Sequence, residues 1–271
     1  MARLELSTPR GRLVVFGWQT DVMQKAAELA LADLERAGSG MEQIEFAGRA
    51  VWFKRSGFRG KAQARWALKR ACGAKLPRVA EYYNHSWLTE RLFETPLPLA
   101  AGELLSRGLP IREFLISAHV PDAITLEEFL GQRAAGDREC VLDELARETA
   151  RMHALGFVHH DLYSRNILVR RTGNPRRLVF LDAWAGGPPP QWRGAAYDMA
   201  CLFLHADTEW IGAEVSRFVA RYALERAAQS RPVDPQRLMT SARRARNRLI
   251  ARLQKRPAER RGRALPGVDF H

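Results

Sequence analysis

Residues 159–182 read HHDLYSRNILVRRTGNPRRLVFLD, and this stretch decides which fold the chain can adopt. Asp161 and Asn166 lie five positions apart, and Asp182 follows sixteen positions after Asn166. Two short apolar segments between Asn166 and Asp182 predict the strands of a β-hairpin, Ile167–Val169 and Leu178–Leu181. Because the second strand of a hairpin runs back alongside the first, the two strands would bring Asn166 and Asp182 to one end of a sheet.

The spacing of Asp161 and Asn166 is typical of the catalytic loop of kinases, in which the aspartate orients the attacking hydroxyl and the asparagine binds Mg²⁺. A helix that ends at Gly156 precedes the loop, and the carboxylate of Asp182 ends the strand that follows it. Phosphoryl transfer needs such groups because its transition state is mainly a problem of positioning and charge neutralisation. We predict that Asp161 orients or deprotonates a hydroxyl and that Asn166 and Asp182 bind Mg²⁺. A buried polar loop with a coincidental spacing is the competing interpretation.

The histidines near this loop could in principle form a metal site of their own. His159 and His160 are adjacent and would point to different sides of an extended loop, and no cysteine lies nearby in a ligand spacing. Hydrogen bonds within the loop explain His159 better, and His153 is expected to be a packing residue of the preceding helix. Downstream, Asp198 is expected to brace the catalytic loop from below, as a structural residue.

A lysine suited to phosphate binding lies at the end of a predicted strand. Val51-Trp-Phe-Lys54 has the V-x-x-K pattern of the kinase strand whose lysine contacts the phosphates of ATP. An ordinary lysine at the end of a strand is the alternative. The glutamate that usually pairs with this lysine is not evident, because Glu81 and Glu90 are both candidates and His85 stands at the position that aligns best.

The sequence lacks the G-x-G-x-x-G loop that covers the phosphates in protein kinases. Only Gly48, Gly57 and Gly60 lie near the predicted strand, so a shorter or basic turn must cover the phosphates. The residues assigned to nucleotide binding are Lys54, Gly48, Ser117 and His119.

Strands are predicted mainly in the first part of the chain and helices in the second. Besides the hairpin, the predicted strands are Leu13–Phe16, Ile44–Phe46, Ala50–Lys54 and Phe114–Ile116. The predicted helices are Asp21–Ala37, Ala64–Arg70, one from Glu81 to before Thr95, one from Thr125, Asp137–Leu155, Ala195–His205, Ile211–Gln229 and Pro235–Lys255. This order predicts an α+β protein of two lobes, a β-rich N-lobe over residues 1–116 and a mainly helical C-lobe over 122–271, joined by a hinge at 117–121.

The chain is strongly basic. Its 271 residues carry 43 lysines and arginines against 30 acidic residues, a formal charge of +13. Such a charge favours polyanionic partners, namely nucleic acid, an anionic membrane or a phosphorylated substrate. Only six of the basic residues are lysines, however, and an arginine-rich chain can also reflect the base composition of the genome. The charge alone does not choose between these explanations.

Neither the cysteines nor the apolar segments indicate export. Cys72, Cys140 and Cys201 are odd in number and far apart, which predicts three buried thiols in a reducing cytosol. No apolar run approaches the roughly 18 residues that a membrane span needs, and the N-terminus lacks an apolar signal core. We expect a cytoplasmic protein.

Several segments resemble the lipopolysaccharide kinase family, which includes the Kdo and heptose kinases of the bacterial core oligosaccharide. The segments that carry the resemblance lie between about residues 40 and 215: Val51–Lys54, Gly57–Lys61, Asn84–Trp87, Thr95–Pro98, Phe114–Ser117, Met152–Gly156 and, most typical, His160-Asp-Leu-Tyr163. The resemblance implies a fold similar to that of protein kinases, the use of ATP and Mg²⁺, and a sugar as acceptor. The departures are the missing helix glutamate and Asp182-Ala-Trp184, where protein kinases have Asp-Phe-Gly.

We therefore expect a kinase that phosphorylates a sugar hydroxyl of the lipopolysaccharide core, either lipid-linked or soluble. A protein substrate is disfavoured, since about a dozen residues between Asp182 and the helix at Ala195 leave no room for a long activation loop. An aminoglycoside- or choline-type kinase and a protein kinase remain alternative enzymes. A basic pseudokinase that binds a membrane or nucleic acid is the alternative without catalysis, and nucleic acid is the less favoured partner.

The C-terminal segment concentrates the positive charge. The stretch from Arg243 to Arg263 contains ten basic residues and a single acidic one, Glu259. Apolar residues recur at helical spacing in and before this stretch: Leu238, Ala242, Ala245, Leu249 and Leu253. A helix packed on the C-lobe with solvated arginines is one interpretation. The other is attraction to an anionic membrane, which would place the protein peripherally at the inner face of the inner membrane.

Overall fold

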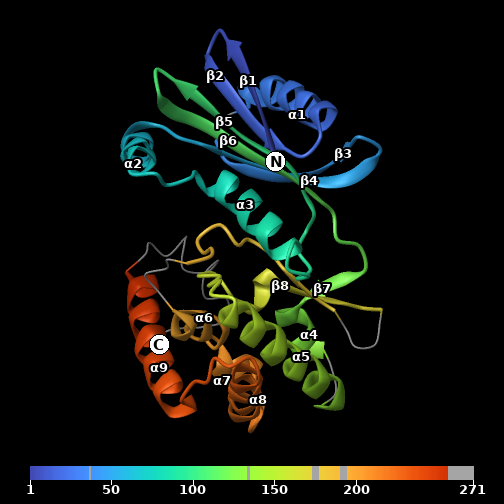
Figure 1. Ribbon diagram of the computed structural model, residues 1–271, viewed down its shortest axis with the longest axis vertical. Coiled ribbons are helices and arrows are strands. Elements are labelled where there is room, and N and C mark those ends of the chain that lie inside the picture. The colour runs from blue at the N-terminus through green and yellow to red at the C-terminus, as the bar shows by residue number, and fades with distance from the viewer. Residues whose placement is uncertain (37, 133–134, 173–176, 190–193, 256–271) are drawn as a thin grey trace. The chain divides into compact units, whose positions relative to one another are not determined.

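The computed structural model describes residues 1–36, 38–132, 135–172, 177–189 and 194–255 (Figure 1). The chain divides into two compact units. The first comprises Met1–Ala123 together with Val179–Ala185, and the second comprises Ile124–Leu178 and the described residues from Gly186 onward. The short segment Val179–Ala185 therefore packs with the N-terminal part of the chain, although we predicted it to be part of the C-lobe.

The first unit is built on an antiparallel sheet of six strands in the order β1-β2-β5-β6-β4-β3. The strands are β1 (Ala2–Thr8), β2 (Gly11–Gly17), β3 (Gly40–Phe46), β4 (Arg49–Gly57), β5 (Pro98–Ser106) and β6 (Leu109–Ala118). The helices are α1 (Thr20–Ala32), the 3₁₀ turn η1 (Asp33–Glu35), α2 (Gly60–Ala71) and α3 (Pro77–Thr89). The apolar side of α1 packs on the sheet, where Met23 and Ala26 join a core that includes Val15, Val51 and Phe53.

Two strands of this sheet were not predicted, and β5 shows why. Its sequence, PLAAGELLS, contains no β-branched residue, so its local β propensity is low. The strand forms because it is central: it pairs with β2 on one side and with β6 on the other. Gly102 is required there, since a Cβ would lie 2.5 Å from the ring of Phe114 and 2.7 Å from the carbonyl oxygen of Val14. Tertiary pairing has overridden local propensity.

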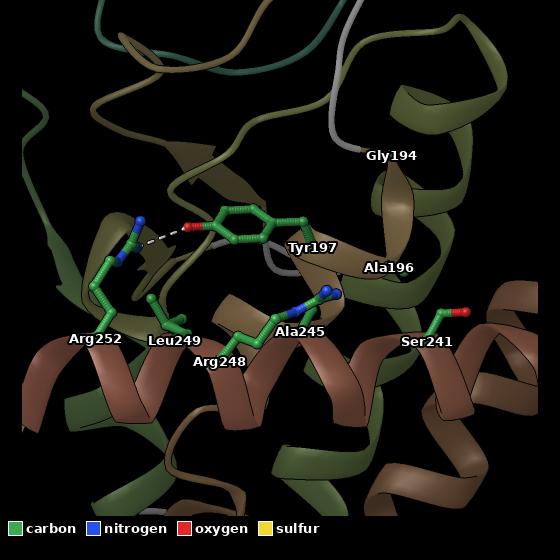
Figure 2. A pocket seen from close by; sticks show the side chains of 8 residues that line it. All are labelled: Gly194, Ala196, Tyr197, Ser241, Ala245, Arg248, Leu249 and Arg252. Atoms are coloured by element: carbon green, nitrogen blue, oxygen red, sulfur yellow. Dashed lines mark hydrogen bonds between the residues drawn. The ribbon is translucent and has the colours of Figure 1, made fainter.

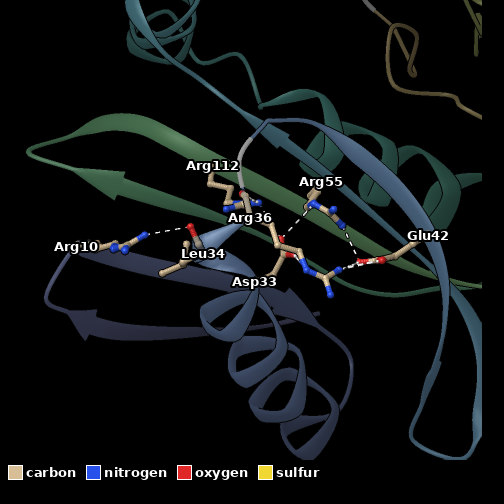
Figure 3. A network of polar contacts seen from close by, with 7 residues as sticks. All are labelled: Arg10, Asp33, Leu34, Arg36, Glu42, Arg55 and Arg112. Atoms are coloured by element: carbon tan, nitrogen blue, oxygen red, sulfur yellow. Dashed lines mark hydrogen bonds and ion pairs between the residues drawn. The ribbon is translucent and has the colours of Figure 1, made fainter.

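A network of charged side chains joins η1 to the sheet (Figure 3). The buried carboxylate of Asp33 accepts a 2.8 Å hydrogen bond from Arg112 on β6 and lies 3.4 Å from Arg55 on β4. Glu42 on β3 accepts hydrogen bonds from Arg55 at 2.7 Å and from Arg36 at 2.8 Å. The partly buried guanidinium groups of Arg55 and Arg112 are thus each paired with a carboxylate, as partly buried charges require.

The second unit is mainly helical. Its elements are α4 (Leu126–Gln132), α5 (Ala135–Ala154), the 3₁₀ turn η2 (Ser164–Asn166), β8 (Ile167–Arg170), α6 (Ala195–Leu202), α7 (Ala206–Glu209), α8 (Glu214–Ala228) and α9 (Pro235–Gln254). Two further strands, β7 (Ala123–Thr125) and β9 (Leu178–Phe180), contain residues of both units. The three strands form a small sheet in the order β7-β8-β9, and the chain passes between the two units within β7 and β9. Helix α5 packs on α8, and α6 packs on α9.

The helix ends of this unit follow the sequence signals. Thr125 and Glu128 form a capping box at the start of α4, because the Glu128 N–H donates to Thr125 Oγ1 at 3.1 Å and the Thr125 N–H donates to Glu128 Oε2 at 3.0 Å. Gly156 takes a φ of +84° two residues after the end of α5, and its N–H donates to the carbonyl of His153. The helix start predicted at Thr125 and the helix end predicted at Gly156 are both confirmed.

Helix α9 buries the apolar stripe that the sequence predicts, namely Leu238, Ala242, Ala245, Leu249 and Leu253. Arg243 and Arg244 are exposed on the same helix, whereas residues 256–263 of the predicted basic segment lie outside the described residues. None of the described helices is long and apolar enough to cross a membrane.

The prediction of three buried thiols is wrong for two of them. Cys201 is buried on α6, but Cys72 and Cys140 are exposed. Cys72 follows α2, a helix without any buried residue, and Cys140 lies on a solvent-facing turn of α5.

Candidate active site

In the first unit, the predicted phosphate-binding lysine is held between two carboxylates. Lys54 Nζ, on β4, donates to Glu81 Oε1 on α3 at 2.6 Å and also to Asp182 Oδ1. Glu81 is fully buried, and its second oxygen accepts a 2.6 Å hydrogen bond from Arg78. The structure therefore selects Glu81 as the partner of Lys54. Glu90, the other candidate, is exposed and pairs with Arg91.

This arrangement keeps both Lys54 and Asp182 charged at neutral pH. Burial by itself would lower the pKa of Lys54, but the carboxylates of Glu81 and Asp182 raise it above the ordinary lysine value. Burial would likewise raise the pKa of Asp182, and the positive charges of Lys54 and Arg78 lower it to about 2. The cluster thus presents a fixed cation next to an ionised carboxylate.

The backbone around Asp182 is held in an unusual conformation. Asp182 has a φ of +54°, which lies in the left-handed region that few residues other than glycine adopt. The carbonyl of Ala183 accepts a 2.5 Å hydrogen bond from Asn84 Nδ2 on α3, and the Phe180 N–H donates to the carbonyl of Glu94 at 2.9 Å. Such a conformation costs on the order of 1 kcal/mol and persists only where its surroundings impose it, which is common at functional sites.

Helix α3, which carries Glu81, is itself capped from the sheet. Pro77 begins the helix, and the next residue, Arg78, donates its backbone N–H to Glu113 Oε2 on β6 at 2.8 Å. Glu113 is almost fully buried, and this burial raises its pKa to about 7 although the N–H and the positive charge of Arg78 oppose the change. The register between α3 and the sheet, and with it the reach of Glu81 toward Lys54, depends on this contact.

In the second unit, the catalytic loop is anchored on Asp198 of α6. The fully buried carboxylate accepts backbone hydrogen bonds from His159 and His160, both at 2.7 Å. The ring of His153 lies 3.1 Å from the same carboxylate through Nε2 and 2.8 Å from the hydroxyl of Tyr222 through Nδ1. Asp198 braces the loop as predicted. His153, expected to be a packing residue, is instead a buried polar link.

Asp161 and Asn166 are tied to each other within this loop. The backbone carbonyl of Asp161 accepts hydrogen bonds from Asn166 Nδ2 at 2.9 Å and from the Tyr163 N–H at 2.8 Å. His160, directly before Asp161, has a φ of +62°. Because its Nδ2 is committed to Asp161, the amide of Asn166 has a fixed orientation, and its oxygen remains the atom suited to a cation.

The other residues assigned to nucleotide binding lie at one end of the first-unit sheet. Ser117 pairs with Trp52 across β4 and β6, and the His119 N–H donates to the carbonyl of Ala50 at 3.1 Å. Gly48 lies two residues before Ala50, in the turn between β3 and β4. This turn is six residues, or about 20 Å of extended strand, away from Lys54. His119 thus lies near the Gly48 turn and Ser117 lies beside β4 between that turn and Lys54, whereas Gly48 itself is not close to the lysine.

Two features define a phosphotransferase of the kinase type. One is a sheet strand whose lysine pairs with a helix glutamate, and the other is an Asp-x₄-Asn loop that a buried aspartate braces. The comparisons agree. The model of the lipopolysaccharide kinase (Kdo/WaaP) family matches residues 55–222, which is more than half of the chain. A structure of WaaP in complex with acyl carrier protein is similar with a TM-score of 0.58 at 19% identity, over 87% of this chain and 98% of that chain.

Two structures of glucosamine kinase are also similar. One, in crystal form B, has a TM-score of 0.48 at 14% identity over 87% of this chain and 82% of that chain. The other, in complex with glucosamine, ADP and inorganic phosphate, has a TM-score of 0.45 at 16% identity over 87% and 81%. A search of curated proteins found no significant match. The fold assignment rests on the WaaP structure and on the family match.

The chain belongs to the lipopolysaccharide kinase (Kdo/WaaP) family. It has the predicted α+β, protein-kinase-like fold, and it is an ATP-dependent kinase with a role in lipopolysaccharide biosynthesis.

Sequence reasoning missed residues that position the site rather than form it. Arg78 lies three residues before Glu81 on α3, a spacing at which helix side chains meet, but this follows only once the helix is known to start at Pro77. The contact of Asn84 with the carbonyl of Ala183, 99 residues away, cannot be inferred from spacing. Tyr222 lies 69 residues from its partner His153. Pro77 was the one available signal, because a proline at the first position would have placed the start of α3 before Glu81 rather than at it.

Glu113 makes stability depend on pH in a testable direction. Its pKa is about 7 in the folded protein against 4.5 for an ordinary glutamate carboxyl, so the folded state binds more protons between these values. Stability therefore falls as the pH rises through this range. Glu113→Gln keeps an acceptor for Arg78 and removes the titration. Urea unfolding at pH 5 and pH 8 should show that the wild type loses on the order of 2 kcal/mol more than the variant over this range.

The matched control for this experiment is Glu28→Gln, which changes an exposed carboxylate on α1. It should preserve the wild-type difference between the two pH values. A Glu113→Gln variant with the same difference as the wild type would show that Glu113 does not titrate in this range.

Proposed function

We propose that this kinase transfers the γ-phosphoryl group of ATP to a hydroxyl of a Kdo or heptose sugar in the lipopolysaccharide core. The observation that carries the proposal is the loop of Asp161 and Asn166, whose backbone is fixed by the buried carboxylate of Asp198 and by the Asn166 amide. The family match supplies the class of acceptor, because it is a family of lipopolysaccharide kinases.

In this proposal, Asp161 holds the reacting hydroxyl of the sugar and accepts its proton as the new oxygen–phosphorus bond forms. Its backbone is immobilised by two hydrogen bonds to its carbonyl, so little conformational freedom is lost when the acceptor binds. The adjacent His160 is packed edge to face on Tyr197, with ring centroids 5.8 Å apart, which further limits movement of the loop.

The donor set fits a magnesium nucleotide. Asp182 supplies a carboxylate that is ionised at neutral pH, and Asn166 supplies an oriented amide oxygen, both of them the hard oxygen ligands that Mg²⁺ prefers. Lys54, held by Glu81, would bind the α- and β-phosphates, and Ser117, His119 and the Gly48 turn would bind the rest of the nucleotide. When bound, Mg²⁺–ATP supplies the phosphoryl group and the metal neutralises phosphate charge.

The length of the segment after Asp182 favours a small acceptor over a protein. Helix α6 begins at Ala195, as predicted, so only residues 183–194 separate it from Asp182. Protein kinases use a long segment at this point to bind a peptide. An aminoglycoside- or choline-type kinase would share this feature and is the second candidate. The intact cluster of Lys54, Glu81 and Asp182 argues against a pseudokinase.

The acceptor class can be tested with labelled ATP and a panel of acceptors. We expect the protein to phosphorylate core-oligosaccharide fractions in the presence of Mg²⁺, and to transfer at least a hundredfold less label to an aminoglycoside, to choline or to casein. Mass spectrometry of the product would locate the phosphate on Kdo or heptose. Transfer to one of the other acceptors alone would replace the proposal with the corresponding alternative.

The roles of Asp161 and Asp182 predict different kinetic effects. Asp161→Asn should lower kcat by about a thousandfold or more and leave Mg²⁺–ATP binding nearly unchanged, since it removes the group that orients and deprotonates the hydroxyl. Asp182→Ala should lower turnover and also weaken Mg²⁺–ATP binding by at least tenfold, because it removes a metal ligand. Turnover assays and calorimetric titration with Mg²⁺–ATP separate the two. Full activity of Asp161→Asn would refute its assignment.

We also propose that the exposed arginines of α9 attract the protein to an anionic membrane surface that holds a lipid-linked acceptor. The helix carries six arginines and no acidic residue. Each basic residue near such a surface contributes on the order of 1 kcal/mol. Truncation before α9 would not test this, because it would also expose the buried stripe of Leu238, Leu249 and Leu253.

Charge removal on the exposed side gives a cleaner test. Arg243→Gln/Arg244→Gln should reduce co-sedimentation with anionic vesicles by about tenfold at low salt, and high salt should abolish the difference. The control Arg49→Gln/Arg107→Gln removes the same charge from exposed positions in the first unit and should bind like the wild type. Equal binding to neutral and anionic vesicles would reject the membrane role.

A further inference from the structure

A pocket in the second unit lies between α6 and α9 (Figure 2). Its volume is about 490 Å³, which is in the range of small-molecule sites. The polar side chains that line it are those of Tyr197, Ser241, Arg248 and Arg252, and none of the described lining residues is acidic. Lys54, Glu81 and Asp182, which belong to the first unit, are not among the residues that line it.

Two arginine side chains line the pocket. Arg248 and Arg252 lie four residues apart, which places them on the same face of α9, and Figure 2 shows both side chains on the side of the helix toward Tyr197. Arg252 donates to the hydroxyl of Tyr197 at 3.1 Å. Among the described residues, Arg248 has no hydrogen bond or ion pair, so its guanidinium is available to a ligand. Two adjacent guanidinium groups favour a carboxylate or a phosphate, which each can bind through paired hydrogen bonds.

The pocket is one side chain away from the catalytic loop. The ring of Tyr197, which lines the pocket, packs edge to face on His160, directly before Asp161. Leu249, also in the lining, packs in one cluster with Tyr163, two residues after Asp161. A ligand held here would therefore lie near the residue that we assign to the acceptor hydroxyl.

We propose that this pocket binds an anionic substituent of the acceptor, a sugar carboxylate or a sugar phosphate, through Arg248 and Arg252. The inference rests on the proposed function and specifies it: the acceptor is a charged glycan, recognised by a group other than the hydroxyl that receives the phosphoryl group. Arg248 and Arg252 are then specificity residues. Ser241 and Tyr197 add hydroxyl groups that can hydrogen-bond the anion or a neighbouring sugar hydroxyl.

The first experiment measures anion binding without catalysis. Inorganic phosphate, glucuronate and glucose are titrated into the full-length protein by calorimetry at two salt concentrations. We expect salt-sensitive binding of at least one of the two anions and none of glucose. Arg248→Gln and Arg252→Gln should each weaken that binding by at least fivefold. The control Arg237→Gln changes an exposed arginine of α9 outside the pocket and should bind as the wild type does.

The second experiment measures kinetics with a core-oligosaccharide acceptor. Arg248→Gln should raise the KM for the acceptor by at least tenfold while kcat and the KM for ATP stay within twofold, because in this proposal Arg248 binds a group of the acceptor other than the reacting hydroxyl. Acceptor treated with phosphatase and acceptor with reduced carboxyl groups distinguish the two anions. The treatment that removes the recognised group should make the wild type resemble Arg248→Gln. Thermal unfolding checks that the variants are folded.

The outcomes separate this inference from the proposed function. Suppose that the wild type phosphorylates the sugar, and that Arg248→Gln and Arg252→Gln behave like Arg237→Gln in both experiments. This result would overturn the pocket assignment and leave the proposed function intact. If the wild type binds an anion but does not phosphorylate the sugar, and Arg248→Gln loses the anion binding, the proposed acceptor is wrong and the pocket is still an anion site. No binding of either anion, together with unchanged acceptor KM in both variants, would also overturn the pocket assignment.

Discussion

The catalytic loop depends on one buried carboxylate. Asp198 is fully enclosed, and it is tolerated there because it accepts two backbone N–H groups of the loop and contacts the ring of His153. Burial would raise its pKa, but these contacts lower the pKa below the ordinary aspartate value, so the carboxylate stays ionised. Without it the N–H groups of His159 and His160 would be buried without acceptors, at about 1–3 kcal/mol each. The geometry of Asp161 therefore follows from a charge placed on a different helix.

The first unit also contains buried charges, and there several charged side chains compensate one another. Lys54, Glu81, Asp182 and Arg78 would each be costly to bury alone, and together they neutralise one another. The six-stranded sheet holds Lys54, and the cap from Glu113 holds the helix that carries Glu81. The left-handed backbone at Asp182 is imposed by contacts from α3 and the segment after it. A rigid support thus presents one cation and one carboxylate in fixed positions, which is the pre-organisation that phosphoryl transfer needs.

Much of the second unit could be predicted from local patterns. The helix stop at Gly156, the capping box at Thr125 and the buried stripe of α9 each follow from residues within one or two turns of each other. The brace from Asp198 was predicted as well. The first unit was harder, because strand β5 is poor in β-forming residues and exists only through its neighbours on both sides.

The sequence by itself determined the class of chemistry: Asp161, Asn166 and Asp182 lie at spacings along one continuous stretch, and a spacing within a loop and a hairpin is a local property. The tertiary structure decided the partner of Lys54, the contact of Asn84 with the backbone after Asp182, and the pocket of Arg248 and Arg252. Each of these depends on how a helix is rotated against a distant element. That rotation follows from packing over the whole face of the helix, so no pair of sequence positions encodes it alone.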